Sequence, residues 1–351
     1  MKKRRDRARE RAASFTAAIE AAPPGAVLVL PHDYPDPDAL ASAFGMQAFL
    51  ERVCDRRSVL AFAGGLGRPQ NRAMAGLLDI ASVEIDTVDF PAVGGAVLMD
   101  TQPGAGNNSL PPRLPVIGVF DHHGPPESPY EAAWIDVRAD YGSTSTIVTE
   151  YLLASGVAID KRLACALLMG IRTDTEDLER DTSEADVAAF LTLFPLADRQ
   201  MMIQIQRPVL SEEYFGMLRR ALQVARRWGD AVVANLGPVP VPDLLSEVSE
   251  LFALLKGADL SLAVGTHGGD VYLSLRTRRA KRSLLEIIRT IVGPEGRAGG
   301  HGRAVGGRLH PKDGDEKGAA EALCELFIES IRASEDGPKP VCLEEPLPPP
   351  P

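Results

Sequence analysis

Short apolar runs alternate with segments of helical periodicity through the first 200 residues of this 351-residue chain. The apolar runs have the length of buried strands, and the helical segments are long enough to cross back over a sheet. Such alternation is typical of an α/β fold in which a mostly parallel sheet is covered on both faces. The predicted strands are residues 27–30, 58–63, 96–99 and 116–120, and the predicted helices are 39–53, 70–78, 143–154, 161–171 and 184–193.

The rest of the chain follows a different pattern, which predicts a second, smaller α/β domain. His267-Gly268-Gly269 between two apolar runs indicates a hairpin turn. The predicted strands are 231–236, 260–265 and 271–276, and the predicted helices are 211–228, 242–256, 281–291 and 316–331. We therefore predict a basic extension at 1–20, a catalytic domain at 21–205, a linker helix at 206–229, a substrate-binding domain at 230–335 and a disordered proline-rich tail at 336–351.

Charge is distributed unevenly along the chain. The net charge of −10 argues against a protein that coats long nucleic acid, yet residues 276–308 hold nine Lys or Arg against two Glu. A basic segment on an acidic protein suits a small polyanionic ligand. The basic start of the chain, residues 1–11, favours a solvated helix or a frayed terminus over a nucleic-acid arm, because short charge runs usually lie on the surface.

Cysteine usage and hydropathy predict a cytoplasmic protein. The four cysteines include no C-x-x-C pair, so neither a disulfide framework nor a zinc ribbon is expected. The basic start is not followed by the apolar stretch of a secretory signal, and no apolar run reaches the roughly 18 residues of a membrane span.

Acidic and imidazole side chains come directly after three of the predicted strands. His32-Asp33-Tyr34-Pro35-Asp36-Pro37-Asp38 follows the first strand, Asp100 follows the third, and Asp121-His122-His123 follows the fourth. Asp174 comes at the end of a predicted helix. The carboxyl ends of the strands in an open α/β sheet converge on one crevice, where ligands bind. We therefore expect these side chains to meet.

Four carboxylates in one place would repel one another unless they are protonated or neutralised. Two divalent cations would balance their charge, and two neutral imidazoles would add the nitrogen ligands that suit manganese. Two ions about 3.5–4 Å apart can activate a water and bind a phosphoryl oxygen, which predicts hydrolysis of a phosphate ester or anhydride. The four carboxylates are those of Asp36, Asp38, Asp100 and Asp174, and His32, His122 and His123 are the imidazoles available.

Each of these features alone has a simpler explanation. A single Asp after a strand, such as Asp100, is usually a cap or turn residue. Asp36 and Asp38 beside two prolines also fit a helix N-terminus, where acids are favoured. Two imidazoles directly after an apolar strand, at 122 and 123, are harder to explain without a ligand. The combination of all four clusters favours the metal site.

The motifs HDYPDPDALAS, LMD, DHH and GIRTDT, in this order and spacing, resemble those of the DHH phosphoesterase family. The later stretch AGGHG at 298–302, preceded by Leu275-Arg276, resembles the accessory DHHA1 domain found in nanoRNase A-like enzymes and RecJ-like exonucleases. The resemblance spans roughly residues 25 to 310. The first motif departs from the family pattern, since Pro37 and Ala41 stand where glycines are usual.

The resemblance implies a role for each matched residue. It gives Asp100 a bridging position between two ions, commonly Mn²⁺ and sometimes Mg²⁺, and it places His123 against the scissile phosphate. The first ion would be held by His32, Asp36 and Asp100, and the second by Asp38, Asp100, His122 and Asp174. Arg276 and His301 would clamp substrate phosphates, aided by a backbone nest at Gly299 and Gly300.

We therefore predict an enzyme that cleaves short oligonucleotides to mononucleotides and also dephosphorylates pAp, with His123, Asp100 and Asp38 as catalytic residues. A phosphodiesterase for cyclic or linear dinucleotides would use the same site. A non-catalytic nucleotide-binding regulator would be expected to lack ligands, and a pyrophosphatase of this family would be expected to carry a different second domain. The expected partner is a short oligonucleotide or nucleotide, without a membrane, and a homodimer is the oligomeric state to test.

Overall fold

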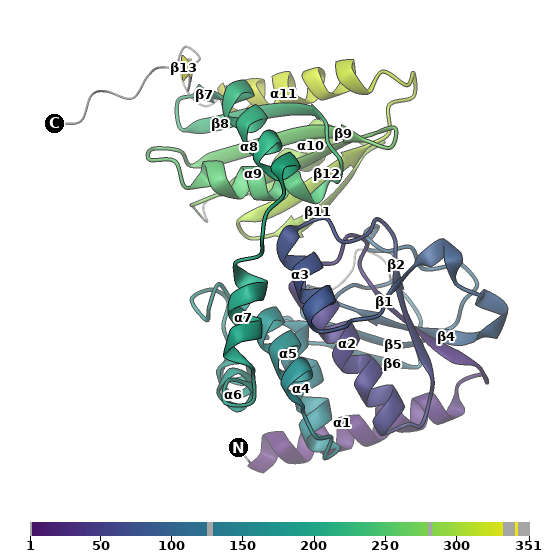
Figure 1. Ribbon diagram of the computed structural model, residues 1–351. Coiled ribbons are helices and arrows are strands. Elements are labelled where there is room, and N and C mark those ends of the chain that lie inside the picture. The colour runs from purple at the N-terminus through teal and green to yellow at the C-terminus, as the bar shows by residue number, and fades with distance from the viewer. Residues whose placement is uncertain (1, 125–128, 280–282, 333–340, 343–351) are drawn as a thin grey trace. The chain divides into compact units, whose positions relative to one another are not determined.

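The computed structural model describes residues 2–124, 129–279, 283–332 and 341–342, and the chain divides after Pro208 into two compact units (Figure 1). The first unit is built on a six-stranded sheet in which all strands run parallel. Its strands are β1 (Ala26–Pro31), β2 (Ser58–Phe62), β3 (Val83–Glu84), β4 (Val93–Met99), β5 (Val116–Asp121) and β6 (Trp134–Val137).

The strand order is β3-β2-β1-β4-β5-β6, which confirms the predicted parallel α/β architecture. The chain moves outward from β1 to β3, then returns to place β4 on the other side of β1. In open α/β sheets, ligands bind outside the carboxyl ends of the strands at such a reversal of the strand order. His32 and Asp100 follow β1 and β4, the two strands that flank this point.

Both faces of the sheet are buried, but by different kinds of structure. Val27 and Val29 face a layer that contains α1 (Lys2–Ala21), α2 (Pro37–Arg52), α4 (Thr144–Ala154) and α5 (Lys161–Asp174). Leu28 and Leu30 alternate to the other face, as strand geometry requires. That face is covered by irregular segments, among them the short 3₁₀ helices η1 (Ile85–Thr87) and η2 (Phe90–Ala92). The remaining helices are α3 (Pro69–Leu77), α6 (Glu184–Leu193) and α7 (Arg199–Gln206).

The N-terminal segment is a helix, which was one of the two expected forms, but one face of this helix is buried and not solvated. It forms α1, and Phe15 and Ile19 on this helix are 0% and 1% exposed. Phe15 packs edge-on against Phe120 of β5, with ring centroids 4.8 Å apart. Ala8 and Ala12 continue the same buried stripe at helical spacing. Because arginines lie between these positions, the amphipathic pattern is not obvious in the sequence, although the apolar face of the helix is part of the core.

The second unit contains a seven-stranded mixed sheet in the order β11-β12-β10-β9-β8-β7-β13. Only β8 and β9 pair in parallel, with α9 between them in sequence, and the other pairs are antiparallel. One face packs on α8 and α9 and the other on α10 and α11. The elements are α8 (Glu212–Val224), β7 (Arg226–Trp228), β8 (Ala231–Pro238), α9 (Asp243–Ala253), β9 (Leu260–His267), β10 (Asp270–Thr277), α10 (Leu284–Val292), β11 (Arg297–His301), β12 (Ala304–Leu309), α11 (Glu316–Arg332) and β13 (Val341–Cys342).

Two turns in this unit illustrate what the sequence does and does not reveal. Gly268 and Gly269, with φ of 58° and 87°, close the predicted hairpin between β9 and β10. The predicted helix 211–228 is too long, because it ends at Val224 and residues 226–228 form β7. Gly229, with φ of 60°, makes the tight turn that pairs β7 with β8.

Part of the predicted C-terminal tail lies outside the described residues, namely 336–340 and 343–351, while residues 341–342 pair with β7. In the portion of the chain that the structure describes, no helix combines the length and the apolar character needed to cross a membrane.

Candidate metal centre

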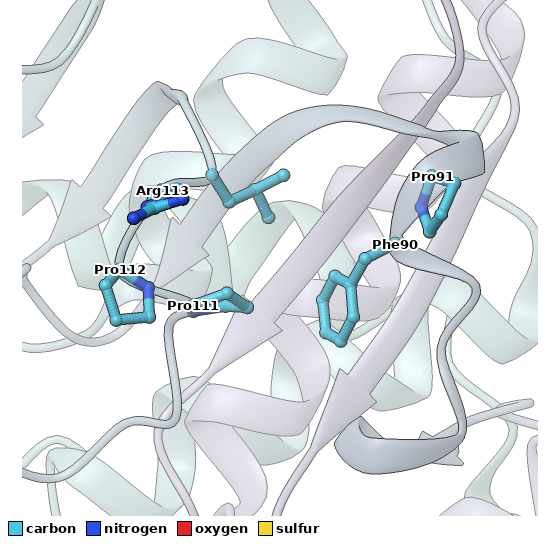
Figure 2. Close-up of a pocket in the computed structure, with 6 residues that line it drawn as sticks. Phe90, Pro91, Pro111, Pro112 and Arg113 are labelled. Carbon is cyan, nitrogen blue, oxygen red and sulfur yellow. The ribbon is translucent and has the colours of Figure 1, made fainter.

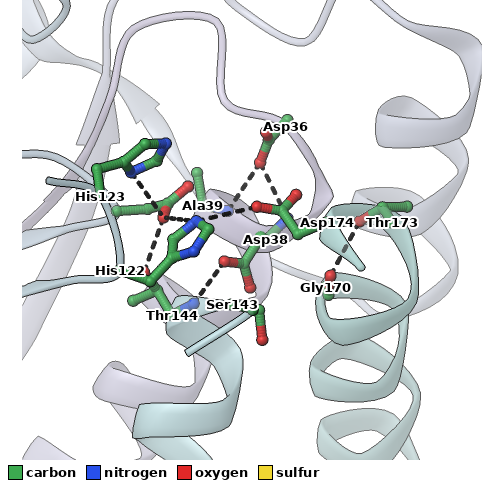
Figure 3. A network of polar contacts seen from close by, with 12 residues as sticks. Asp36, Asp38, Ala39, His122, His123, Ser143, Thr144, Gly170, Thr173 and Asp174 are labelled. Carbon is green, nitrogen blue, oxygen red and sulfur yellow. Dashed lines mark hydrogen bonds and ion pairs between the residues drawn. The ribbon is translucent and has the colours of Figure 1, made fainter. Parts of the chain in front are cut away.

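Four chain segments bring polar side chains together at the carboxyl ends of β1, β4 and β5 (Figure 3). His32 and Asp36 lie in the loop after β1, Asp100 directly follows β4, and Asp174 is the last residue of α5. The donor atoms form three overlapping groups, and within each group they lie within 4.8 Å of one another. The groups are His32, Asp36 and Asp100; Asp100, His122 and His123; and Asp38, His122 and Asp174.

The start of α2 presents Asp36 and Asp38. Asp36 is the N-cap, and its Oδ1 accepts hydrogen bonds from the amides of Asp38 and Ala39, each at 3.0 Å. Pro37 occupies the first helical turn, where its missing N–H costs nothing and its fixed φ suits the helix. Asp36 therefore caps a helix, as the simpler explanation proposed, and its Oδ1 also lies 3.8 Å from His32 Nε2.

Asp100 lies between the groups. Its φ of 59° is left-handed, and its amide donates to the carbonyl of Phe120 at 2.8 Å, which ties the end of β4 to β5. The two carboxylate oxygens face different imidazoles: Oδ1 is 3.5 Å from His122 Nε2, and Oδ2 is 3.8 Å from His32 Nε2. Within the described residues Oδ2 is buried and accepts no hydrogen bond. A carboxylate placed this way can bridge two cations.

Asp38 is completely buried against the start of α4. Its Oδ2 accepts from the amide of Thr144 at 2.7 Å and its Oδ1 from the amide of Ser145 at 2.9 Å. A carboxylate offers about four lone-pair positions, so these bonds orient Asp38 and leave capacity for a cation. The positive end of the helix dipole also favours the ionised carboxylate there.

The imidazoles of His32 and His122 are oriented by backbone carbonyls. His32 Nδ1 lies 2.9 Å from the oxygen of Asp33, and His122 Nδ1 lies 3.2 Å from the oxygen of Tyr141. Since a carbonyl only accepts, Nδ1 is the donor in both rings. Each Nε2 therefore points toward the carboxylates, with His122 Nε2 3.1 Å from Asp174 Oδ2. Histidine metal ligands in proteins are usually held in this way.

His123 is held by a different partner. Its Nδ1 and its amide both donate to Asp121 Oδ1, at 2.7 and 3.2 Å. The other oxygen of Asp121 accepts from Gln102 Nε2 at 2.7 Å. About a third of the His123 side chain is exposed, whereas only 7% of that of His122 is. Of the two neighbouring imidazoles, His123 is the one that a ligand can reach from solvent.

The electrostatics of the cluster fit a cation site. Burial lowers the pKa of His32, but Asp36 and Asp100 outweigh it and raise this pKa to about 10. Burial raises the pKa of Asp100 to about 6, despite the opposing effect of the two neighbouring imidazoles. Burial and the adjacent carboxylates also raise the pKa of Asp38. Without metal, the cluster lowers its repulsion by holding protons, which divalent cations would replace.

The sequence-based prediction did not include several residues that hold the proposed ligands and the start of α4 in place. Thr144 donates its hydroxyl to Asp100 Oδ1 at 2.7 Å, and Asp186 accepts from the amide of Gly142 at 2.9 Å and from the hydroxyl of Thr146. The run of small polar residues at 142–146 is a signal for a helix N-terminus that could have indicated this support. No comparable sequence signal indicates that Gln102 donates to Asp121.

Apart from His123, the predicted substrate-binding residues lie in the second unit, and their link to the metal centre stays a prediction. Arg276 on β10 donates to Ser274 Oγ at 3.0 Å and to Glu250 Oε1 at 3.1 Å. Gly299 and Gly300 lie on β11, where a Cβ at Gly300 would come within 2.5 Å of the Ala304 carbonyl oxygen. His301 ends the same strand, and its side chain lies outside what the structure describes.

A hollow of about 490 Å³ lies apart from this centre (Figure 2). Its residues precede β4 and β5 in sequence, which places it toward the amino ends of these strands, away from the polar cluster. The lining is mainly apolar and consists of Phe90, Pro91, Pro111, Pro112, Arg113 and Leu114.

The chain is similar to known proteins in sequence and in fold. The model of the DHH family, N-terminal domain, matches residues 26–171. An uncharacterized protein of Methanocaldococcus jannaschii is 30% identical over 309 residues, which cover 88% of this chain and 63% of that protein. A probable manganese-dependent inorganic pyrophosphatase of Streptococcus thermophilus is 31% identical over 163 residues, covering 45% of this chain and 51% of that protein. The chain therefore spans less than two thirds of the length of either relative.

A solved structure shares the fold of the chain. It is the crystal structure of an exopolyphosphatase-related protein from Bacteroides fragilis, with a TM-score of 0.68 at 16% identity. The superposition covers 93% of this chain and 97% of that one, so the likeness includes both units.

Proposed function

Because residues 26–171 match the model of the DHH family, N-terminal domain, we propose that the chain is a two-metal phosphoesterase that hydrolyses short oligonucleotides to mononucleotides. The observation that carries this proposal is the placement of Asp100. Its two carboxylate oxygens face separate His-and-Asp groups, and one of these oxygens is buried without a hydrogen bond among the described residues. Such an arrangement is costly for a buried anion unless cations complete it.

We assign the first ion to His32, Asp36 and Asp100, and the second to Asp38, Asp100, His122 and Asp174. When bound, two divalent ions supply the Lewis acidity that activates water and neutralises charge on phosphoryl oxygens. Manganese is the favoured metal because the donors are mixed oxygen and imidazole nitrogen. The name of the streptococcal relative, a manganese-dependent pyrophosphatase, supports the same choice.

In this proposal His123 donates a hydrogen bond to the phosphoryl group and is not a metal ligand. Burial lowers its pKa, but Asp121 and Asp100 outweigh that effect and raise it. In the metal-free protein the imidazole therefore carries its second proton over a wider pH range than a free histidine. Asp121 fixes Nδ1, so Nε2 would donate to a phosphoryl oxygen as negative charge develops there.

The second unit limits the class of substrate that we propose. Its basic segment 276–308 suits a short polyanion on an otherwise acidic chain. Arg276 would bind a substrate phosphate, together with His301 and the glycine backbone at 299–300. The dinucleotide pGpG and the bisphosphate pAp fit the same description and belong to the proposed range. The free thiols of Cys54 and Cys165 agree with a reducing cytoplasm as the site of action.

Inorganic pyrophosphate is the second candidate substrate. Curated relatives that match 45% to 66% of this chain are described as manganese-dependent inorganic pyrophosphatases. The metal centre proposed above would serve a phosphoanhydride as well as a phosphodiester.

The test is product analysis over time with metal-free protein reloaded with Mn²⁺. The panel contains pGpG, 5′-labelled RNA and DNA dinucleotides, pAp, pyrophosphate and bis-p-nitrophenyl phosphate. We expect nucleotide monophosphates from the dinucleotides and no turnover after chelation. Asp100→Asn and His122→Ala should abolish turnover, while Arg9→Gln on the exposed face of α1 should not change it. Full activity in Asp100→Asn would contradict the proposal, and turnover of pyrophosphate alone would favour the second candidate.

A further inference from the structure

A buried charge network is linked to the metal centre through Tyr141, and the proposed hydrolysis assigns it no role. The guanidinium of Arg138 binds both oxygens of Asp136, with Nε–Oδ1 of 2.8 Å and Nη2–Oδ2 of 2.6 Å. Its Nη1 lies 2.5 Å from Glu150 Oε2. Asp136 and Arg138 are 4% and 6% exposed. One guanidinium between two carboxylates leaves a negative charge without balance, which is costly in a buried place.

The N-terminal helix α1 adds two guanidinium groups, which change the formal charge of the network from −1 to +1. Arg4 Nε lies 2.5 Å from Glu150 Oε1, and Arg11 Nη1 lies 3.2 Å from Asp136 Oδ1. About a third of each of these two side chains is exposed, so they close the network from the solvent side. We call Arg4, Arg11, Asp136, Arg138 and Glu150 the arginine network.

The arginine network fixes Tyr141 at both its ring and its backbone. The guanidinium carbon of Arg138 lies 4.8 Å from the centre of the Tyr141 ring, and the Tyr141 hydroxyl donates to Glu150 at 3.2 Å. The Arg138 carbonyl accepts from the Tyr141 amide at 3.0 Å, and the Arg138 amide donates to the Asp121 carbonyl at 2.9 Å. The Tyr141 carbonyl, held in this way, is the group that accepts from His122 Nδ1.

We propose that the arginine network, completed by α1, positions Tyr141 so that His122 presents Nε2 to its metal ion. The basic start of the chain thus serves the metal centre. The inference rests on the proposed function only in taking His122 as a ligand. Outer partners of a histidine ligand typically change metal affinity by about 10- to 100-fold. His32 depends on the adjacent Asp33 carbonyl instead, so the effect should be confined to one of the two ions.

The experiment compares full-length wild-type protein with the double variant Arg4→Gln/Arg11→Gln in equilibrium titrations with Mn²⁺, followed by the electron paramagnetic resonance of free Mn²⁺. We expect one class of site to weaken by about 10- to 100-fold and the other to stay unchanged. Arg9→Gln, an exposed arginine of the same helix, is the matched control and should leave both classes unchanged. Arg4→Lys/Arg11→Lys keeps both charges and should recover most of the lost affinity.

Some outcomes overturn the positioning role. Two unchanged classes of site in the Gln variant would do so, and so would an equal loss in both classes together with a lower melting temperature, since that indicates a merely structural role. If the Gln variant does not fold, Tyr141→Phe carries the same test, because it removes only the hydroxyl contact with Glu150. A selective weakening of one class by a few-fold is then expected, and no change would overturn the proposal.

The titration separates this inference from the proposed function. Wild-type protein that binds two Mn²⁺ ions but hydrolyses nothing in the substrate panel would defeat the proposed activity, while the comparison of the variants would still decide the role of the arginine network. Wild-type protein that binds no Mn²⁺ would defeat both.

Discussion

Thr144 holds Asp100 and Asp38 at the same time, although Asp100 follows β4 and Asp38 lies at the start of α2. Its hydroxyl donates to Asp100 Oδ1 at 2.7 Å, and its amide donates to Asp38 Oδ2 at 2.7 Å. The side chain and the backbone of one residue therefore set the relative placement of the proposed bridging ligand and a ligand of the second ion.

Replacing Thr144 by Val should separate these two contacts, because Val keeps the shape and the amide but loses the hydroxyl. We expect metal affinity and kcat/KM to fall by about 10- to 100-fold. Thr149→Val is the control, since the Thr149 hydroxyl donates only to the Ser145 carbonyl, at 2.7 Å. It should cost about 1 kcal/mol of stability and leave metal affinity unchanged. Equal metal affinities in Thr144→Val and wild type would contradict the role of the hydroxyl.

Asp100→Asn should stabilise the metal-free protein in a pH-dependent way. The folded-state pKa of Asp100 is raised from 3.8 to about 6, so ionisation of Asp100 is penalised in the fold. The penalty is absent below about pH 4, grows as the pH rises toward 6 and is complete above it, with an upper value of about 3 kcal/mol. Asn also tolerates the left-handed backbone at this position, with φ of 59°.

Urea unfolding of the metal-free proteins at pH 4 and pH 7.5 measures this difference. The free energy of unfolding of Asp100→Asn should exceed that of wild type more at pH 7.5 than at pH 4. A difference that does not change with pH would show that Asp100 is not under electrostatic strain.

His123→Gln should distinguish a phosphate-binding role from a ligand role, since His123 also lies in one of the three possible metal groups. If His123 donates a hydrogen bond to the phosphoryl group, the variant keeps two Mn²⁺ ions per chain and loses about 10²-fold in kcat. His122→Gln is the comparison and should lose affinity for one ion. Loss of an ion from His123→Gln would reverse the assignment.

Arg276→Gln tests whether the second unit binds substrate. We expect the KM for a 5′-phosphorylated dinucleotide to rise by about tenfold or more, the size expected when a charge-assisted hydrogen bond is lost. Mn²⁺ affinity should stay unchanged. Arg278→Gln removes the same charge from an exposed position two residues away and is the control. An equal rise of KM in both variants would indicate a general effect of charge.

The parts of the site that follow strands could be predicted because parallel strands end at a common edge. His32, Asp100 and His122 needed only the apolar runs before them and the convergence of strand ends. Asp174 follows no strand, and its assignment to the site came from the resemblance of GIRTDT to the family motif. Their close approach agrees with the prediction, while metal binding itself remains to be measured.

The supporting residues could not be predicted in the same way, because their partners are far away in sequence. Arg4 pairs with Glu150 across 146 residues, and a charged residue near a terminus looks the same whether it is solvated or paired. Strand β6 was missed because its four residues include Asp136, a buried acid that is compensated by Arg138, Arg11 and the Tyr151 hydroxyl. A local sequence pattern reveals the periodicity of a helix or strand, but it does not reveal which distant charge will neutralise a buried one.

The start of α4 limits how the protein can vary in evolution. The loop 138–143 before it carries the Tyr141 carbonyl, which accepts from His122 Nδ1, and the Gly142 amide, which donates to Asp186. Inserting or deleting one residue in this short loop would displace these contacts and the first residue of α4, Thr144, which holds both Asp38 and Asp100. We therefore expect homologous chains to keep a constant number of residues between β6 and Thr144, while the longer connection from β4 to β5 tolerates changes in length.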